Sequence, residues 1–151
     1  MMFDDKYDAL KLCNQLGFPL YASVRETIKS YRTYLTGLDL TYTQYLAMLS
    51  LWEFGKMNVK EMGKKLFLDS GTLTPVLKSL ESKGYVSRNR STEDERVLIV
   101  ELTETGEALK EKAVDIPKSM ATLVRLDSEE TLQLYRLLYK LIGVAEEDIP
   151  Y

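Results

Sequence analysis

The chain has 151 residues, of which 45% are hydrophobic, and its formal net charge is −3. This length and composition suffice for about one domain with one core. One cysteine and no histidine exclude an internal disulfide, Ser-His-Asp and Cys-His catalysis, and histidine-ligated zinc. No apolar run approaches the roughly 20 residues that span a bilayer, and the N-terminus lacks the basic-then-apolar order of a secretory signal. We therefore expect a cytoplasmic protein with no membrane partner, no metal and no cofactor.

Charge is distributed unevenly along the chain. Between Lys56 and Arg90, eight basic residues stand against three acidic ones, whereas acidic residues dominate from Asp127 onward. For a nucleic-acid partner, the local distribution of charge matters more than the net charge. The basic middle third therefore keeps DNA open as a partner despite the negative total.

The first predicted helix runs from Tyr7 to about Tyr34. The residues near one another in this pattern are Leu10, Cys13, Leu16 or Gly17, Leu20, Val24 and Ile28. Gly17-Phe18-Pro19 interrupts the pattern. Proline removes a backbone donor and disfavours the α region at the residue before it, so we expect a kink or a restart there.

Two capped helices follow. Thr41-Tyr42-Thr43-Gln44 has the form of a capping box and opens a helix to about Phe54. That helix is apolar almost all round and should be central and buried, and Gly55 ends it. Asn58-Val59-Lys60-Glu61 is a second cap with an acid three residues later, and it opens a short helix.

The stretch from Leu66 to Gly84 carries the next helix, capped by Asp69 or Ser70. Its inner face is Leu73, Val76, Leu77 and Leu80, and its outer face with the flanks is Gly71, Thr74, Pro75, Lys78, Ser79 and Ser82. Such small, hydroxylated side chains allow close approach to phosphates or base edges, and Lys78 adds charge. An ordinary amphipathic surface helix has the same periodicity, but a short helix, a tight turn and this helix form a helix-turn-helix arrangement.

After Gly84 the periodicity changes. The segments Tyr85–Arg88 and Val97–Leu102 are rich in β-formers, and the residues between them are polar throughout. This pattern predicts a hairpin with a long charged tip. A helix-turn-helix followed directly by such a hairpin is a winged helix, a combination more specific than either half.

The C-terminal third is helical in pattern. Thr103-Glu104 opens a long helix to about Leu123, with a bend expected at Pro117, and Asp127-Ser128-Glu129-Glu130 caps a last helix. Residues 1–36 and 103–151 carry more apolar surface than one small domain needs, which predicts a homodimer interface. The expected fold is mainly α with a small β-hairpin: a single domain, 1–151, with the winged helix-turn-helix at 41–102 flanked by dimerisation helices.

At this point the chain resembles the MarR-type winged-helix repressors, and within them the OhrR-type organic-hydroperoxide sensors. The resemblance covers nearly the whole chain, and its strongest pieces are Leu40–Leu46, Leu68–Pro75 and Asp94-Glu95-Arg96. It implies a helix in the major groove of a pseudo-palindromic operator, an arginine in the minor groove, and Asp94 as a partner that orients a nearby arginine. A solvated turn is the alternative for residues 94–96. The helix face, the basic charge and this resemblance together give the expected DNA-contacting residues: Ser70, Gly71, Thr72, Thr74, Pro75, Lys78, Ser79, Arg88, Arg90, Asp94 and Arg96.

The resemblance also implies a peroxide-reactive cysteine in the first helix, hydrogen-bonded by two tyrosines across the dimer interface. The tyrosines match Tyr31 and Tyr42, but the cysteine position is occupied by Gly17. The sole thiol, Cys13, is expected one helical turn earlier. It either takes over sensing, with an organic hydroperoxide or a small thiol as its reaction partner, or packs as a small hydrophobe.

The predicted function is a homodimeric transcriptional repressor that binds double-stranded DNA and is released by hydroperoxide through thiol oxidation. The alternative is a regulator without thiol chemistry, controlled by a small molecule in a pocket between the first helix and the DNA-binding lobe. That pocket would be lined by Tyr21, Tyr31, Tyr42 and Trp52. An enzyme is the least favoured function, because Cys13 is its only candidate nucleophile.

Overall fold

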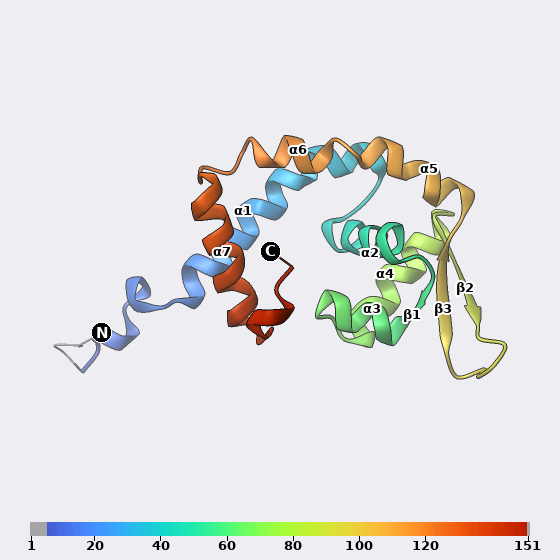
Figure 1. Cartoon of the computed structure of the whole chain (residues 1–151), viewed down its shortest axis with the longest axis horizontal. Coiled ribbons are helices and arrows are strands. Elements are labelled where there is room, and N and C mark those ends of the chain that lie inside the picture. The colour runs from blue at the N-terminus through green and yellow to red at the C-terminus, as the bar shows by residue number, and fades with distance from the viewer. Residues whose placement is uncertain (1–5, 151) are drawn as a thin grey trace. The chain divides into compact units, whose positions relative to one another are not determined.

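The computed structural model describes residues 6–150 and contains two compact units, which adjoin in sequence between Ile116 and Pro117. The first unit holds helices α1 to α5 and a small sheet, and the second holds most of α6 and all of α7 (Figure 1). The expected class, mainly helical with a small antiparallel sheet, is confirmed.

The segment before α1 is not a continuation of that helix. Residues Asp8–Leu10 and Leu12–Asn14 form 3-10 turns, and α1 spans Gly17–Leu35. Pro19 lies in the first turn of α1, where its missing N–H needs no partner, whereas a continuous helix would place its ring against an upstream carbonyl. The restart predicted here is therefore confirmed, and the α-helix predicted from Tyr7 is wrong.

Helix α2, Tyr42–Phe54, is the centre of the first unit. Thr41 and Gln44 form the predicted capping box, with backbone-to-side-chain hydrogen bonds of 3.0 and 3.3 Å. The buried apolar residues of α2 are Tyr45, Ala47, Met48 and Leu51. Gly55 follows the last turn at a φ of 74°, a region that favours glycine. The central position, the cap and the stop are all confirmed.

The helix-turn-helix consists of α3, Val59–Leu66, and α4, Ser70–Ser82. The capping box of Asn58 and Glu61 opens α3. Leu73, Leu77 and Leu80 are buried and form the inner face of α4, as the spacing predicts.

The turn between α3 and α4 is tight. Phe67 ends α3 in the left-handed region, at a φ of 54°. Gly63 is buried, and a Cβ added to it would lie 2.6 Å from the backbone oxygen of Leu68. A glycine therefore allows the turn to close against α3.

The sheet has three antiparallel strands: β1, Met57–Asn58, β2, Val86–Arg90, and β3, Leu98–Leu102, in the order β1-β3-β2. The hairpin of β2 and β3 is the predicted wing, and it extends beyond β1 (Figure 1). The sequence did not predict β1, which pairs Met57 with Val100 and is too short to show an alternating pattern.

The wing is fixed at its base by α5, Glu104–Ala113, whose N-cap is Thr103. A Cβ on Gly106 would lie 1.9 Å from the backbone oxygen of Tyr85, so α5 approaches the start of the wing more closely than any side chain permits. The carbonyl of Gly106 also accepts a hydrogen bond from Trp52 Nε1 at 3.0 Å. The predicted long helix stops at Ala113 and resumes as α6, Ile116–Ala121, so the bend expected at Pro117 is confirmed as a break.

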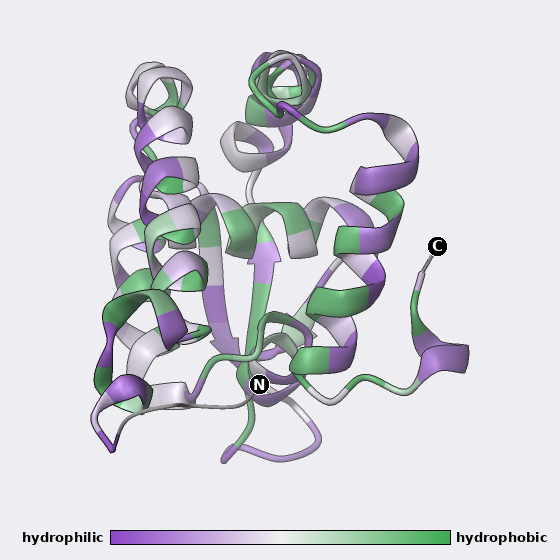
Figure 2. Cartoon of the chain, turned by 90° about the vertical axis from the view of Figure 1, so that its left-hand side faces the viewer, coloured by the Kyte–Doolittle hydropathy of each residue, from purple (hydrophilic) through white to green (hydrophobic). Residues whose placement is uncertain are grey.

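In the second unit, α7 spans Ser128–Leu141 and opens with the predicted capping box at Asp127 and Glu130. Hydrophobic and hydrophilic residues alternate in bands along α7 (Figure 2). The large hydrophobic side chains exposed along α7 and just after it are Leu132, Leu134, Tyr135, Leu137, Leu138, Leu141 and Ile142. Within residues 6–150, no helix is both long enough and apolar enough to cross a membrane.

Candidate DNA-binding surface and sensing segment

The outer face of α4 has the composition that the sequence predicts. Its exposed residues are Ser70, Gly71, Thr72, Thr74, Pro75, Lys78 and Ser82. The Thr74 hydroxyl donates to the Ser70 carbonyl at 2.6 Å, which leaves its lone pairs directed away from the helix backbone. The face is small and polar and carries one cation, a combination suited to close approach to an anionic surface.

Asp69 fixes the first turn of α4. Its carboxylate accepts hydrogen bonds from the backbone N–H and from the hydroxyl of Thr72, each at 2.9 Å. These bonds, the backbone one first, hold the pKa of the Asp69 carboxyl below its usual value. The only carboxylate at the start of α4 is thus engaged by the helix itself, and Asp69 is the cap.

Ser79 does not belong to the outer face. Its hydroxyl accepts a 2.9 Å hydrogen bond from Nε2 of Gln44, a buried residue of α2. The prediction that Ser79 faces DNA is therefore wrong, because the helix turns this side chain toward α2.

Arg88 is also engaged within the protein. Its Nε and Nη2 atoms lie 3.0 and 2.5 Å from the same Glu81 carboxylate oxygen, and its side chain is 17% exposed. The hydrogen bonds from Arg88 hold the pKa of Glu81 below its usual value. This ion pair joins the end of α4 to β2, so Arg88 stabilises the junction and is not presented as a phosphate ligand.

The tip of the wing presents the remaining arginines. Arg90 donates to the Glu95 carbonyl at 2.5 Å, and Arg96 is exposed. Asp94 accepts a hydrogen bond from the backbone N–H of Arg96 at 2.9 Å. This bond caps the turn at the wing tip, and the role of Asp94 in orienting an arginine side chain stays a prediction.

Cys13 lies outside the helix in which the sequence placed it. It belongs to the exposed 3-10 turn Leu12–Asn14, and its sulfur lies 3.8 Å from Oδ1 of Asn14. The prediction of one helical turn between Cys13 and Gly17 is wrong, because α1 begins only at Gly17. Within one chain the thiol is exposed, so Cys13 does not pack as a small hydrophobe inside the chain's own core.

Gly17 itself has room for a side chain. Among the described residues, a Cβ at this position would meet no atom within 4 Å beyond its chain neighbours and its own helix. Steric crowding within one chain therefore does not explain why a glycine occupies this position.

Tyrosines of α1 and α2 form a packed aromatic cluster. The ring of Tyr31 lies 4.9 Å from that of Tyr42 and 5.9 Å from that of Tyr45, which in turn lies 6.4 Å from Trp52. Burial raises the pKa of Tyr45 to about 12, with smaller contributions from Tyr31 and Tyr42. Tyr21 is exposed and lies against Arg25, away from this cluster's ring contacts, and a pocket lined by Tyr21, Tyr31, Tyr42 and Trp52 stays a prediction.

A groove does occur nearby, between the end of α1, the start of α2 and the end of α4. Its volume is about 390 Å³. The residues that line it are Ile28, Arg32, Leu35, Thr36, Asp39, Leu40, Thr41, Tyr42 and Lys83. Of the four aromatic residues expected in a pocket, it includes Tyr42 alone.

Comparison with known proteins assigns this fold to a family. Residues 29–113 match the family model of the transcriptional regulators SarA and Rot. The organic hydroperoxide resistance transcriptional regulator of Bacillus subtilis is 52% identical over 139 residues, which are 92% of this chain and 95% of that protein. The chain belongs to the MarR and SarA/Rot family of winged-helix transcriptional regulators.

Two solved structures are similar to this MarR-family regulator over nearly its whole length. Reduced AbfR of Staphylococcus epidermidis bound to DNA has a TM-score of 0.76 and 35% identity, covering 91% of this chain and 96% of AbfR. AbfR has also been solved overoxidised on DNA and with a disulfide formed. A mutant of Escherichia coli MarR, solved in complex with operator DNA, has a TM-score of 0.77 and 26% identity, covering 93% of this chain and 100% of MarR.

Three polar residues hold this regulator's DNA-binding lobe together in a role that the sequence pattern does not show: Gln44, Glu81 and Lys83. The pattern indicates Gln44 only as part of the cap of α2, and Lys83 only as part of the basic charge of the middle third. Their partners lie 35 to 44 residues away in sequence, where periodicity carries no signal. Glu81 and Arg88 are opposite charges seven residues apart across a turn, a spacing that could have suggested the ion pair.

Proposed function

We propose that this regulator is a homodimeric repressor that binds a pseudo-palindromic operator in double-stranded DNA. The outer face of α4, with Ser70, Thr74 and Lys78, enters the major groove, and the wing tip with Arg90 and Arg96 lies over the adjacent minor groove. The exposed small and hydroxylated face of α4 carries this proposal, because such a face fits base edges and phosphates closely. Relatives solved on DNA support it.

The proposed dimer uses the helices at both ends of the chain, residues 1–36 and 103–151. The apolar residues exposed on α1 and α7 within one chain support this use. A monomer would leave those side chains in water, and contiguous apolar surface of this kind is typical of an interface. In a two-fold dimer the recognition helices contact major-groove segments about one helical turn apart.

We further propose that oxidation of Cys13 releases the DNA. The thiolate attacks the O–O bond of an organic hydroperoxide, so that the sulfur becomes a sulfenic acid and the peroxide leaves as an alcohol. A small thiol then condenses with the sulfenic acid, giving a mixed disulfide and water. The exposure of Cys13 supports access by both reactants, and no second cysteine exists in the chain to resolve the sulfenic acid.

Fluorescence anisotropy tests both proposals. The probe is a labelled duplex that the reduced protein selects from a random pool, with a scrambled duplex as the control. We expect the parent to prefer the selected duplex and to release it after treatment with cumene hydroperoxide and a small thiol, and Cys13→Ser to remain bound. Failure to select any sequence would refute operator binding, and equal behaviour of parent and Cys13→Ser would refute control by the thiol.

The groove at the end of α1 supports a second form of control, by a small organic anion. Arg32 lies at its wall and supplies a positive charge, while Ile28, Leu35 and Leu40 supply apolar contact. If Cys13→Ser and the parent respond alike to oxidant, this groove becomes the favoured effector site. Arg32→Ala would then abolish release of DNA by an effector found in a screen of carboxylates.

A further inference from the structure

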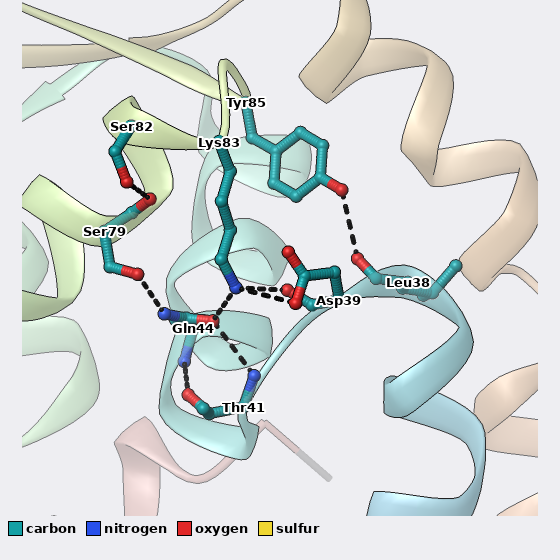
Figure 3. A network of polar contacts seen from close by, with 8 residues as sticks. All are labelled: Leu38, Asp39, Thr41, Gln44, Ser79, Ser82, Lys83 and Tyr85. Atoms are coloured by element: carbon teal, nitrogen blue, oxygen red, sulfur yellow. Dashed lines mark hydrogen bonds and ion pairs between the residues drawn. The ribbon is translucent and has the colours of Figure 1, made fainter.

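Lys83, at the C-terminal end of α4, is bound to the junction between α1 and α2. Its ammonium group donates to the backbone oxygen of Asp39 and lies 3.3 Å from the Asp39 carboxylate and 3.2 Å from Oε1 of Gln44 (Figure 3). An ammonium group has three donors, and three acceptors surround this one. The side chain of Lys83 is only 22% exposed, in contrast to the exposed Lys78 on the outer face of α4.

Gln44 completes the connection from the side of α2. Its Oε1 accepts from the Thr41 backbone N–H at 3.0 Å, which closes the cap of α2, and its Nε2 donates to Ser79 at 2.9 Å (Figure 3). Gln44 is 6% exposed, so neither end of its amide has water as a ready substitute. An amide buried in this way is costly to leave without partners, and it therefore fixes the geometry of both helices.

A third contact ties the segment after α4 to the same junction. The hydroxyl of Tyr85 donates to the carbonyl of Leu38 at 3.2 Å (Figure 3). The last turn of α4 and the first residue after Gly84 are thus held by residues 38–44 at three points. Ser82 joins this network, since its hydroxyl donates to the Ser79 carbonyl at 2.7 Å (Figure 3), whereas the contacts of Gln44, Lys83 and Tyr85 do not involve the outer residues Ser70, Thr74 and Lys78.

We propose that Gln44 and Lys83 are positioning residues for DNA recognition: they hold α4 at the angle at which its outer face fits the major groove. This inference rests on the proposed function, and it adds two residues that do not themselves touch DNA. A binding surface must be held within about 0.5 Å of its productive geometry by supporting side chains. Asp69 fixes the start of α4, and Gln44 and Lys83 fix its end.

Two lysines of the same helix provide a matched test. Lys83→Met and Lys78→Met each remove one positive charge, and binding to the selected and scrambled duplexes is measured over a series of salt concentrations. A phosphate ligand contributes about one unit to the slope of log affinity against log salt. We expect Lys78→Met to lower this slope by about one unit and to weaken binding to both duplexes.

For Lys83→Met we expect about a tenfold loss of affinity for the selected duplex, with an unchanged salt slope and unchanged binding to the scrambled duplex. That result separates positioning from a general loss of charge or of folded protein, which would weaken binding to both duplexes. A fall of the slope by about one unit would show that Lys83 contacts phosphate, and an unchanged preference would show that it positions nothing. Either result overturns the proposal.

Two further measurements keep the test decisive. If Lys83→Met does not fold, Ser79→Ala replaces it, because this change breaks the Gln44 contact alone and favours helix formation. Ser79→Ala should also lose its preference for the selected duplex, with an unchanged slope of log affinity against log salt. If the parent shows no preference for any duplex, the proposed function fails. Hydrogen exchange then decides on positioning: amides 79–83 should exchange faster in Lys83→Met than in the parent and in Lys78→Met, and equal rates would refute it.

Discussion

The close approach of α5 to the base of the wing allows a prediction of stability. In Gly106→Ala the new Cβ would lie 1.9 Å from the Tyr85 carbonyl oxygen and 2.9 Å from its carbon. That carbonyl cannot move easily, because it accepts a 3.1 Å hydrogen bond from the Thr103 N–H, and the Thr103 hydroxyl is bonded to the neighbouring Gly84 carbonyl at 2.6 Å. We therefore expect destabilisation at the upper end of the range for overpacking, about 3 kcal/mol.

Gly17→Ala is the matched control, since a Cβ there meets no described atom beyond its chain neighbours and its own helix within 4 Å. Alanine in place of a helical glycine stabilises by up to about 1 kcal/mol. Urea unfolding followed by circular dichroism, at one protein concentration because the dimer adds to stability, measures both changes. A Gly106→Ala variant as stable as the parent, or a Gly17→Ala variant as unstable as Gly106→Ala, would refute the reasoning.

Three other substitutions test the site and its surroundings. Arg96→Ala should weaken operator binding by about 1–3 kcal/mol if it makes a specific groove contact, and unchanged anisotropy at moderate salt would argue against the wing contact. Gly17→Cys in a Cys13→Ser background restores a thiol at the family position, where space exists, and should give hydroperoxide-dependent release; retention of DNA after oxidation would count against it. Glu81→Gln removes a carboxyl whose pKa is lowered in the folded state, so the parent should be the more stable protein above about pH 5. The difference should begin to shrink as the pH falls below the unfolded value of about 4.3, and it should vanish only below the lower pKa of the folded state. Urea midpoints that differ equally at all pH values would refute that assignment.

Local signals in the sequence predicted most of the winged helix. Three helix starts were marked by a capping residue with an acid or glutamine three residues later, and the structure confirms all three. The capping residues are Thr41, Asn58 and Asp127. The leucine spacing of α4 and the β-rich segments of the wing likewise depend on neighbouring residues. Such features need no knowledge of distant parts of the chain, which is why they could be predicted.

The predictions that were wrong, and the elements that were not predicted, depend on distant residues or on the exact start of a helix. Ser79 and Arg88 have polar side chains on a surface helix and strand, and only the folded arrangement shows that Gln44 and Glu81 bind them. The placement of Cys13 failed because apolar periodicity continues through Gly17, whereas the backbone upstream of Pro19 does not remain helical. The two-residue strand β1 carries too few residues for any periodic signal.

Footprinting of the selected duplex reports both where the protein lies on DNA and whether oxidation removes it. Under reducing conditions we expect two protected major-groove segments on one face of the duplex, about 34 Å apart. Both segments should lose protection together after cumene hydroperoxide and a small thiol. A single protected segment, protection independent of sequence, or protection that persists after Cys13 is oxidised would contradict the proposed function.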